Sequence, residues 1–291
     1  MSSQEITVRS QELGERLRGF RAGAKLTISD AGKRIDLSTS QLSRIETGRR
    51  RPNIETVTAL LAVYGVTGAR RKTAMALARE ACEDGWWHRD RPDFPERQHT
   101  LISLESRADR IVNYEGMLIP GLLQTGEYTR ALMADSKLVP ESEVEQRMVT
   151  RLRRHAVLRR RDAPTFTAVI DELALRRVIG GVDVQRRQLQ HLLEMAQWPN
   201  IRVRVVPNAG AHAGANGSFS LLRQPDGPTV VFLENLTCSL FVEDRSEITT
   251  YEKAFRSLLT QALAETQSGE VIASLATAMD AEADSTWSPP I

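Results

Sequence analysis

One short segment carries side chains that can hydrogen-bond with the edges of nucleic-acid bases: Thr39, Ser40, Gln41, Ser43 and Arg44. Three arginines follow at positions 49–51, and a guanidinium group binds phosphate oxygens in a bidentate manner. Short polar side chains and arginine on the outer face of a helix are suited to reading base pairs in the DNA major groove. The segment therefore predicts contacts with double-stranded DNA, with Arg49, Arg50 and Arg51 placed at the phosphates.

The pattern predicts that this segment is a helix over residues 39–47. Ser38 is a good N-cap residue, and Gly48 is a common terminator at the other end. Leu42 and Ile45 repeat with helical spacing and are expected to face a core, which leaves the polar side chains on the remaining faces.

Four further helices are predicted around it, over residues 9–24, 28–35, 54–66 and 70–81. Apolar residues recur on one face of each, as in the series Leu13, Leu17 and Phe20. A tight turn between the second and third helices would let the third project from the body and enter a major groove.

Residues 12–66 resemble the Xre or lambda-repressor-like helix-turn-helix family. The resemblance rests on S-R-I-E-x-G at residues 43–48, followed by basic residues, Pro52 and an apolar helix. It implies that the polar residues of the third helix and the three arginines face DNA, and that Glu46 is structural and pairs with an arginine or the backbone. Ser29 and Asp30 depart from the family, in which a glutamine at the start of the second helix commonly reaches a phosphate.

The charge distribution agrees with a DNA-binding head on a larger body. Residues 1–80 hold 15 Lys and Arg against 8 Asp and Glu, a net charge of +7, whereas the remaining residues hold 24 and 29, a net charge of −5. A basic segment of this kind suits a polyanion. Because a domain of this size reads only a half-site, a homodimer on an inverted repeat is expected.

The overall composition of the 291 residues excludes several classes. No apolar run is long enough for a membrane span, and the polar N-terminus lacks a signal peptide, so the expected location is the cytoplasm, at the nucleoid when bound to DNA. The two cysteines build no disulfide framework, and no metal or other cofactor is expected. The bias of 34 Arg against 5 Lys indicates a high-GC genome, such as that of an actinobacterium.

The predicted fold class is α+β, with an all-α helix-turn-helix bundle followed by a mixed α/β domain that contains a small sheet. The expected divisions are a DNA-binding domain over residues 1–81, a connector over 82–99, a regulatory or partner-binding domain over 100–280, and a flexible tail over 281–291. Trp86 and Trp87 in the connector are expected to dock onto a domain.

In the second domain, residues 101–118 are predicted to be helical, and residues 141–160 a long arginine-rich helix. Strands are expected at 165–170 and 201–206, with helices between them over 171–179 and 184–197. A meander of three short strands at 218–223, 229–234 and 239–244 and an amphipathic helix at 250–263 complete the prediction.

No enzymatic activity is expected. Neither a phosphate-binding loop nor a serine nucleophile turn is present. Asp171 and Glu172 lie at a strand-to-helix junction, where acidic residues favour the helix N-terminus, and are interpreted as capping residues. The glycine-rich loop 207–217 is either a flexible connection or a rim that closes over a partner or ligand, with His212 and Asn216 as the candidate contacts.

Several segments between residues 100 and 275 resemble an uncharacterised domain of actinobacterial helix-turn-helix regulators, including WhiJ-like developmental regulators and antitoxin-like proteins. These segments are PGLLQTGEYTRAL, RLRRHAVL, AVIDELALRRVIGG, HLLEMAQWPNIRVRVVP and AHAGANGSFSLL. The resemblance implies a transcriptional regulator whose C-terminal domain binds a small protein encoded nearby. The alternatives are a C-terminal domain that senses a small-molecule effector and, least favoured, an enzyme with a DNA-targeting head.

Overall fold

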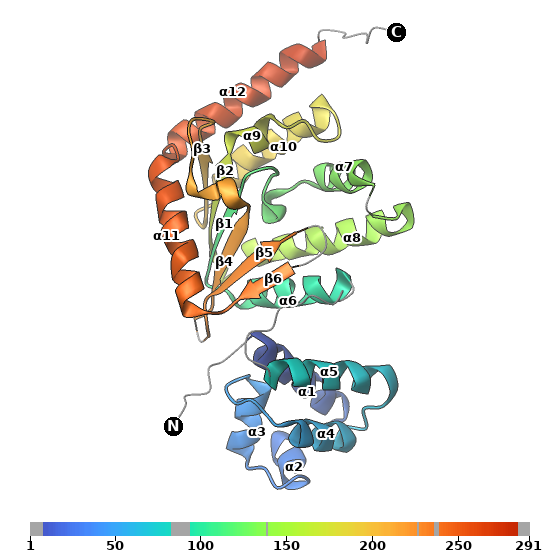
Figure 1. Cartoon of the computed structure of the whole chain (residues 1–291). Coiled ribbons are helices and arrows are strands. Elements are labelled where there is room, and N and C mark those ends of the chain that lie inside the picture. Colours follow the sequence, from blue (N-terminus) through green and yellow to red (C-terminus); the bar gives the residue numbers. More distant parts are fainter. Residues whose placement is uncertain (1–7, 83–93, 138, 226, 236–238, 285–291) are drawn as a thin grey trace.

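The chain folds into an N-terminal helical domain and a C-terminal domain in which helices cover a sheet (Figure 1). The computed structural model describes residues 8–82, 94–137, 139–225, 227–235 and 239–284. The predicted α+β class is therefore confirmed. In the described part of the chain, no helix combines the length and the apolar character needed to cross a membrane.

The N-terminal domain is built from α1 (Val8–Gly23), α2 (Ile28–Lys33), α3 (Thr39–Glu46), α4 (Ile54–Val63) and α5 (Gly68–Cys82). Its core contains Leu13 and Leu17 of α1, Leu42 of α3, and Leu60 and Leu61 of α4, all fully buried. The side chains of the residues that precede α2, α3 and α4 accept hydrogen bonds from the first turn of each helix; they are Thr27, Ser38 and Asn53.

The turn between α2 and α3 is tight and depends on a glycine. The Leu37 N–H donates to the Gly32 carbonyl over 3.0 Å, and Asp36 adopts a positive φ of 55°. A Cβ atom at Gly32 would lie 2.5 Å from the Leu37 carbonyl oxygen. A side chain at position 32 would therefore push α3 away from α2.

The C-terminal sheet has the order β3-β2-β1-β4-β5-β6. The strands are β1 (Arg110–Glu115), β2 (Thr165–Asp171), β3 (Ile201–Val206), β4 (Phe219–Arg223), β5 (Val230–Glu234) and β6 (Ser239–Val242). The first three are parallel, while β4, β5 and β6 form an antiparallel meander, as the sequence predicts.

Helices cover both faces of this sheet (Figure 1). On one face lies α11 (Arg245–Gln261), whose Phe255 and Leu258 pack on Val112 and Val169 of the sheet. The other face carries α6 (Phe94–Arg107), α7 (Gly126–Ser136), α8 (Glu141–Arg154), α9 (Glu172–Arg176) and α10 (Val182–Met195), with α12 (Glu265–Asp284) packed on α10. Short 3-10 turns lie at Gly121–Leu123, His155–Leu158 and Ala213–Asn216.

One helix prediction in this domain is wrong, and a second is confirmed except at its C-terminal end. Residues 101–118 do not form one helix, because α6 ends at Arg107 and the central strand β1 begins at Arg110. Both faces of β1 are covered, so its residues Ile111 to Tyr114 are all buried and show no alternation that would mark a strand. The predicted long helix over 141–160 stops at Arg154 and continues only as a 3-10 turn.

The ends of the predicted divisions also differ from the structure. The expected connector 82–99 includes the start of α6 at Phe94, and the expected tail 281–291 includes the last turn of α12, which the sequence analysis did not predict. The docking prediction for Trp86 and Trp87 lies outside the described residues.

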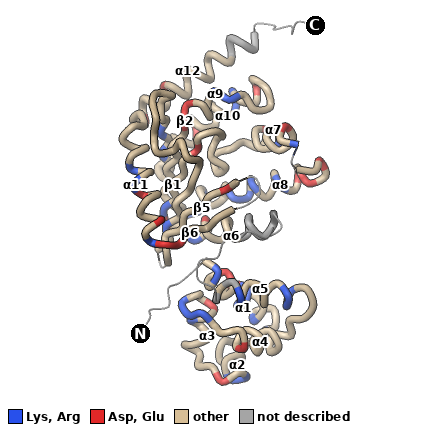
Figure 2. The backbone as a smooth tube through the Cα atoms, viewed as in Figure 1, with Lys and Arg blue, Asp and Glu red and all other residues tan. Residues whose placement is uncertain are grey.

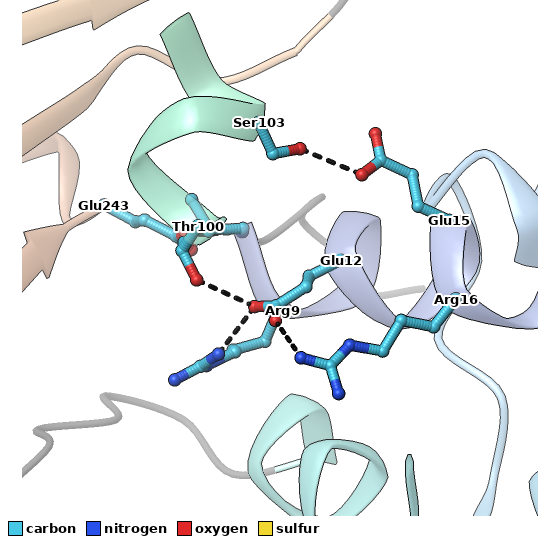
Figure 3. Close-up of polar contacts among 8 residues, drawn as sticks. Arg9, Glu12, Glu15, Arg16, Thr100, Ser103 and Glu243 are labelled. Atoms are coloured by element: carbon cyan, nitrogen blue, oxygen red, sulfur yellow. Dashed lines mark hydrogen bonds and ion pairs between the residues drawn. The ribbon is translucent and has the colours of Figure 1, made fainter. Parts of the chain in front are cut away.

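Helix α1 joins the two domains through its first turns (Figure 3). The Thr100 hydroxyl of α6 donates to Glu12 Oε2 over 3.1 Å, and the Ser103 hydroxyl donates to Glu15 Oε2 over 2.9 Å. Glu15 also pairs with Arg107. Val8 is 1% exposed and packs in a cluster with Leu101, Leu104 and residues of β4, β5 and β6.

We predict opposite effects for two alanine substitutions in α1. A Cβ at Gly14 would lie 2.6 Å from the Ile45 carbonyl oxygen of α3, whereas nothing lies within 4 Å of a Cβ at Gly19. Gly14→Ala should therefore destabilise the N-terminal domain by about 1–3 kcal/mol because the helices must separate. Gly19→Ala should be neutral or stabilise it by up to about 1 kcal/mol.

Urea unfolding of both variants, followed by circular dichroism, measures the difference. A Gly14→Ala variant as stable as Gly19→Ala would contradict the close contact between α1 and α3.

Candidate nucleic-acid interface

Helix α3 presents a polar face to solvent. Thr39, Ser40 and Arg44 are exposed, while Gln41 and Ser43 are half-buried. On the opposite side Leu42 and Ile45 are buried in the core, as the helical spacing predicts. Five of the eight residues proposed to face DNA therefore belong to one short helix with an exposed outer surface.

A capping box fixes the N-terminal end of α3. The Gln41 N–H donates to Ser38 Oγ over 3.1 Å, and the Ser38 N–H donates to Gln41 Oε1 over 2.9 Å. The reciprocal bonds satisfy two backbone donors that would otherwise be unpaired at the helix start. Gln41 is thereby held in one orientation, and only the oxygen of its side-chain amide is used.

The three arginines follow a sharp turn at Gly48. This glycine has a φ of +69°, and a Cβ there would lie 2.6 Å from the Gln11 Cα of α1. The Arg50 N–H donates to the Arg44 carbonyl over 3.1 Å, which folds the arginine segment back beside α3. Arg49 and Arg50 are exposed and Arg51 is half-buried, so the first two are the better placed for phosphates.

A buried ion pair anchors α3 to α1. Arg21 Nε lies 2.7 Å from Glu46 Oε1, and Arg21 Nη2 lies 2.8 Å from Glu46 Oε2, with side-chain exposures of 12% and 2%. Arg21 Nη1 also donates to the Leu26 carbonyl over 2.8 Å. The hydrogen bond with Glu46 raises the pKa of Arg21, and burial raises the pKa of the neighbouring Tyr64 phenol. The structural role expected for Glu46 is confirmed.

Asp30 takes part in the cap of α2. The Thr27 hydroxyl donates to Asp30 Oδ2 over 2.6 Å, and the Asp30 N–H donates to Thr27 Oγ1 over 3.1 Å. The hydrogen bond from Thr27 lowers the pKa of Asp30, so the exposed carboxylate stays charged at neutral pH. A phosphate is therefore expected to be repelled from the start of α2, where the Xre-like family commonly has a glutamine.

Basic segments lie around α3 and along α5 in the N-terminal domain, with acidic residues at α1 and α2, and both signs are also mixed in the C-terminal domain (Figure 2). Basic residues outnumber acidic ones only in the N-terminal part of the sequence. A duplex approaching the exposed face of α3 would therefore meet a favourable field.

The structure separates the two candidate partner-binding residues of loop 207–217. His212 points inward: its Nε2 lies 3.0 Å from Asp171 Oδ2, and its Nδ1 accepts from the Gly214 N–H over 3.1 Å. With both ring nitrogens engaged, His212 holds the loop against the sheet. Asn216 is exposed and is the one of the pair that a partner can reach.

Asp171 caps α9, as the sequence analysis expects. Its Oδ1 accepts from the Leu173 N–H over 2.9 Å, while Oδ2 faces His212. Glu172 Oε2 accepts from the Asn208 N–H over 3.1 Å, which ties the same loop to α9. These contacts account for both carboxylates as structural groups.

Comparison with known families agrees with this division of the chain. Residues 98–274, more than half of the chain, match the family described as a domain of unknown function, DUF5753. The chain belongs to the DUF5753 family. Residues 12–74 match a helix-turn-helix domain, which supports a DNA-binding regulator. No curated protein and no solved structure matches the chain.

The DUF5753 domain contains an open cavity of about 320 Å³ that the sequence analysis missed. Polar and charged side chains from β1, β5, α6 and α8 line it, namely Asn113, Glu115, Glu234, Glu105, Arg151 and Arg154. In the sequence, the cavity is indicated only by Asn113 and Glu115, which are polar positions in an otherwise apolar buried segment. The indication depends on residues 110–115 forming a strand, whereas the sequence predicts a helix there.

We predict that the Arg21–Glu46 pair is needed for the shape of the DNA-binding surface. Glu46→Ala leaves a buried arginine without its carboxylate and should destabilise the N-terminal domain by about 3 kcal/mol. Arg18→Ala, an exposed site on the same helix, should change stability by less than about 0.5 kcal/mol. Thermal unfolding of the two variants tests this, and equal stability would show that the pair contributes little.

Proposed function

We propose that this chain is a sequence-specific, DNA-binding transcription regulator of the Xre type that acts on chromosomal DNA in the cytoplasm and catalyses no reaction. The proposal depends on one observation: the polar face of α3 is exposed, and Arg49 and Arg50 lie directly behind it on a helix-turn-helix domain. A helix presented in this way fits the major groove, where each base pair displays a distinct hydrogen-bonding pattern.

Roles within the surface follow from position. Arg44 is exposed on α3 itself, where a guanidinium can form a bidentate contact with guanine. Thr39, Ser40, Gln41 and Ser43 contribute shorter donors and acceptors near the same groove. Arg49, Arg50 and Arg51 follow the helix and neutralise phosphates, which supplies affinity without sequence preference.

We further propose a homodimer on an inverted repeat. Helix α3 spans only Thr39–Glu46, so one copy can read only a few base pairs. Two copies related by a twofold axis would place their α3 helices in successive major grooves about one helical turn apart.

Two arginine substitutions should separate sequence reading from phosphate binding. Arg44→Ala should weaken binding to a duplex selected from a random library by about 1–3 kcal/mol and relax the preference at one base pair. Arg50→Ala should lower affinity for all duplexes and reduce the salt dependence by about one counterion. Arg79→Ala, exposed on α5, is the matched control.

Mobility-shift titrations at several salt concentrations measure both effects. Arg44→Ala binding the selected duplex as tightly as the unmodified chain would remove α3 as the reading helix.

For the C-terminal domain, we propose that it binds a small protein encoded nearby, as the resemblance to WhiJ-like and antitoxin-like regulators implies. Three exposed apolar side chains support this role, since Met117, Leu173 and Val178 are 54%, 44% and 46% exposed, and we propose that they form one apolar patch. Arg177 lies against Met117, with 4.0 Å between Nη2 and Sδ. The start of loop 207–217 contacts α9 beside Leu173, through the Asn208–Glu172 bond.

Co-expression with the product of an adjacent gene tests the patch. Leu173→Glu should abolish co-purification, because burying the patch would require burying the new charge. Val149→Glu, at an exposed apolar position on α8, should leave it intact. Loss of the complex in both variants, or in neither, would contradict a partner site at the apolar patch.

A small-molecule effector is the second candidate, and the cavity of about 320 Å³ is the observation that favours it. Its size lies within the range of small-ligand sites, and its lining combines apolar walls with a few converging polar groups. A protein partner on the apolar patch and a ligand in the cavity are compatible, since the lining shares only Met117 with the patch.

A further inference from the structure

The cavity lies between the sheet and the helices that cover it. Its floor is formed by inward-facing residues of β1, β4 and β5, and its roof by α6, α8 and the segment after β1. Apolar residues such as Leu101, Ile111, Leu222 and Phe232 supply much of the wall. The charged groups gather at one end, where β1 and β5 finish and β4 starts.

On the floor, a polar cluster replaces the apolar residues expected inside a sheet. Asn113 Nδ2 donates to Ser220 Oγ over 3.0 Å and to Glu115 Oε1 over 3.3 Å. Burial raises the pKa of Glu115 to about 7, although hydrogen bonds from Ser218 and Asn113 oppose this shift. Among the described residues, Glu115 forms no ion pair with an arginine or lysine.

On the roof, Arg151 is half-buried and also has no carboxylate partner in the described part of the chain. Its Nη1 donates to the neutral Gln124 Oε1 over 3.2 Å, and its buried Nε has no hydrogen-bond partner. Burial lowers the pKa of this group, and the nearby charge of Arg154 lowers it further. Buried hydrogen-bond donors are rarely left without an acceptor, so we expect a ligand in the cavity to accept a hydrogen bond from Arg151.

We propose that the cavity binds a small zwitterion of amino-acid type, with its carboxylate on Arg151 and its ammonium group on Glu115 and Glu234. The three groups line one cavity, with the positive charge on the helical roof and the negative charges on the sheet floor. Glu115 is half-buried and Glu234 is exposed at the mouth of the cavity. A ligand with both charges can pair with Arg151 and with the two carboxylates, whereas a simple anion or cation can pair with only one of these sets.

The position of α6 gives this site a route to the DNA-binding domain. Leu101 and Glu105 of α6 line the cavity, while Thr100 and Ser103 of the same helix bond to Glu12 and Glu15 of α1. Spacings of four and three residues place each pair along one side of a helix. A displacement of α6 by the ligand would therefore move the residues that hold α1 (Figure 3).

A buried ion pair provides the element that the ligand would disturb. Arg154 Nη2 lies 2.6 Å from Glu105 Oε1, and Arg154 Nε lies 2.9 Å from Glu105 Oε2, with side chains only 10% and 6% exposed. This pair joins α8 to α6. A carboxylate beside Arg151 would compete with Glu105 for Arg154, so the bound state would favour a different position of α6.

Ligand binding is tested first and without DNA. Each of the twenty free L-amino acids is added to the full chain at millimolar concentration, and binding is followed by the melting temperature and by calorimetry. At least one should bind, and Arg151→Gln should weaken its Kd about tenfold or more. Arg153→Gln, exposed on the same helix, should leave the Kd unchanged. The amide and the N-acetyl derivative of that amino acid should each bind more weakly.

If no amino acid binds the folded chain, the proposal is overturned. It is also overturned if Arg151→Gln binds as well as Arg153→Gln, or if both derivatives bind as well as the parent compound. Circular dichroism of Arg151→Gln shows whether its weaker ligand binding reflects unfolding. In that case Glu115→Gln supplies the second test, with the same expected weakening of the Kd.

The effect of the ligand site on the DNA-binding domain is measured as the change in DNA affinity that the bound amino acid causes. This part rests on the proposed function, and we expect the ligand to change the Kd for the selected duplex at least about fivefold. In a Thr100→Val, Ser103→Ala double variant the ligand should still bind, but its effect on DNA affinity should fall at least about twofold.

The two proposals fail in different ways. An undiminished ligand effect in the double variant, or ligand binding with no effect on DNA in the unmodified chain, would overturn transmission through α6. If the chain binds no DNA with or without ligand, the regulator function fails while the zwitterion site stands.

Discussion

The close packing of α1 against α3 is the constraint on which the DNA-binding surface depends. Gly14 and Gly48 allow the two segments to approach to distances that a Cβ atom would forbid. The Arg21–Glu46 pair then fixes the end of α3, and the turn at Gly48 returns Arg49 and Arg50 to the side of the same helix. Because α1 also contacts α6, the orientation of α3 is tied to the C-terminal domain through a single helix.

The C-terminal domain places its polar chemistry at two different sites of one sheet. Near the ends of β2 and β3, Asp171 caps α9 and contacts His212, and Glu172 accepts a hydrogen bond from the Asn208 N–H. These contacts use the hydrogen-bonding groups of the three side chains within the fold. At the cavity, Arg151 and Glu115 face the same space without forming an ion pair in the described structure. Groups whose hydrogen bonds are used within the fold point to a structural role, whereas the buried, unpaired Nε of Arg151 points to a ligand.

The helices of the N-terminal domain were predictable because apolar residues recur at helical spacing, and α2, α3 and α4 also have a capping residue. Thr27, Ser38 and Asn53 mark three of these starts, and the core leucines have the expected period. The strand β1 was not predictable, since burial on both faces removes the alternation of apolar and polar residues that identifies a strand. The cavity was missed for the same reason: Asn113 and Glu115 are unusual only once residues 110–115 are known to form the central strand.

The contacts of α1 with the C-terminal domain determine how a signal could cross between the domains. Val8 contributes one buried side chain, Glu15 pairs with Arg107, and the Thr100–Glu12 and Ser103–Glu15 bonds are each worth about 1–3 kcal/mol because they involve a carboxylate. A ligand that shifts an equilibrium from 1:99 to 99:1 must favour one state by about 5.5 kcal/mol. Each contact is smaller than this difference, so a bound ligand could rearrange the junction. Such a rearrangement, without any change inside the helix-turn-helix domain, would alter the spacing of two α3 helices in the proposed dimer.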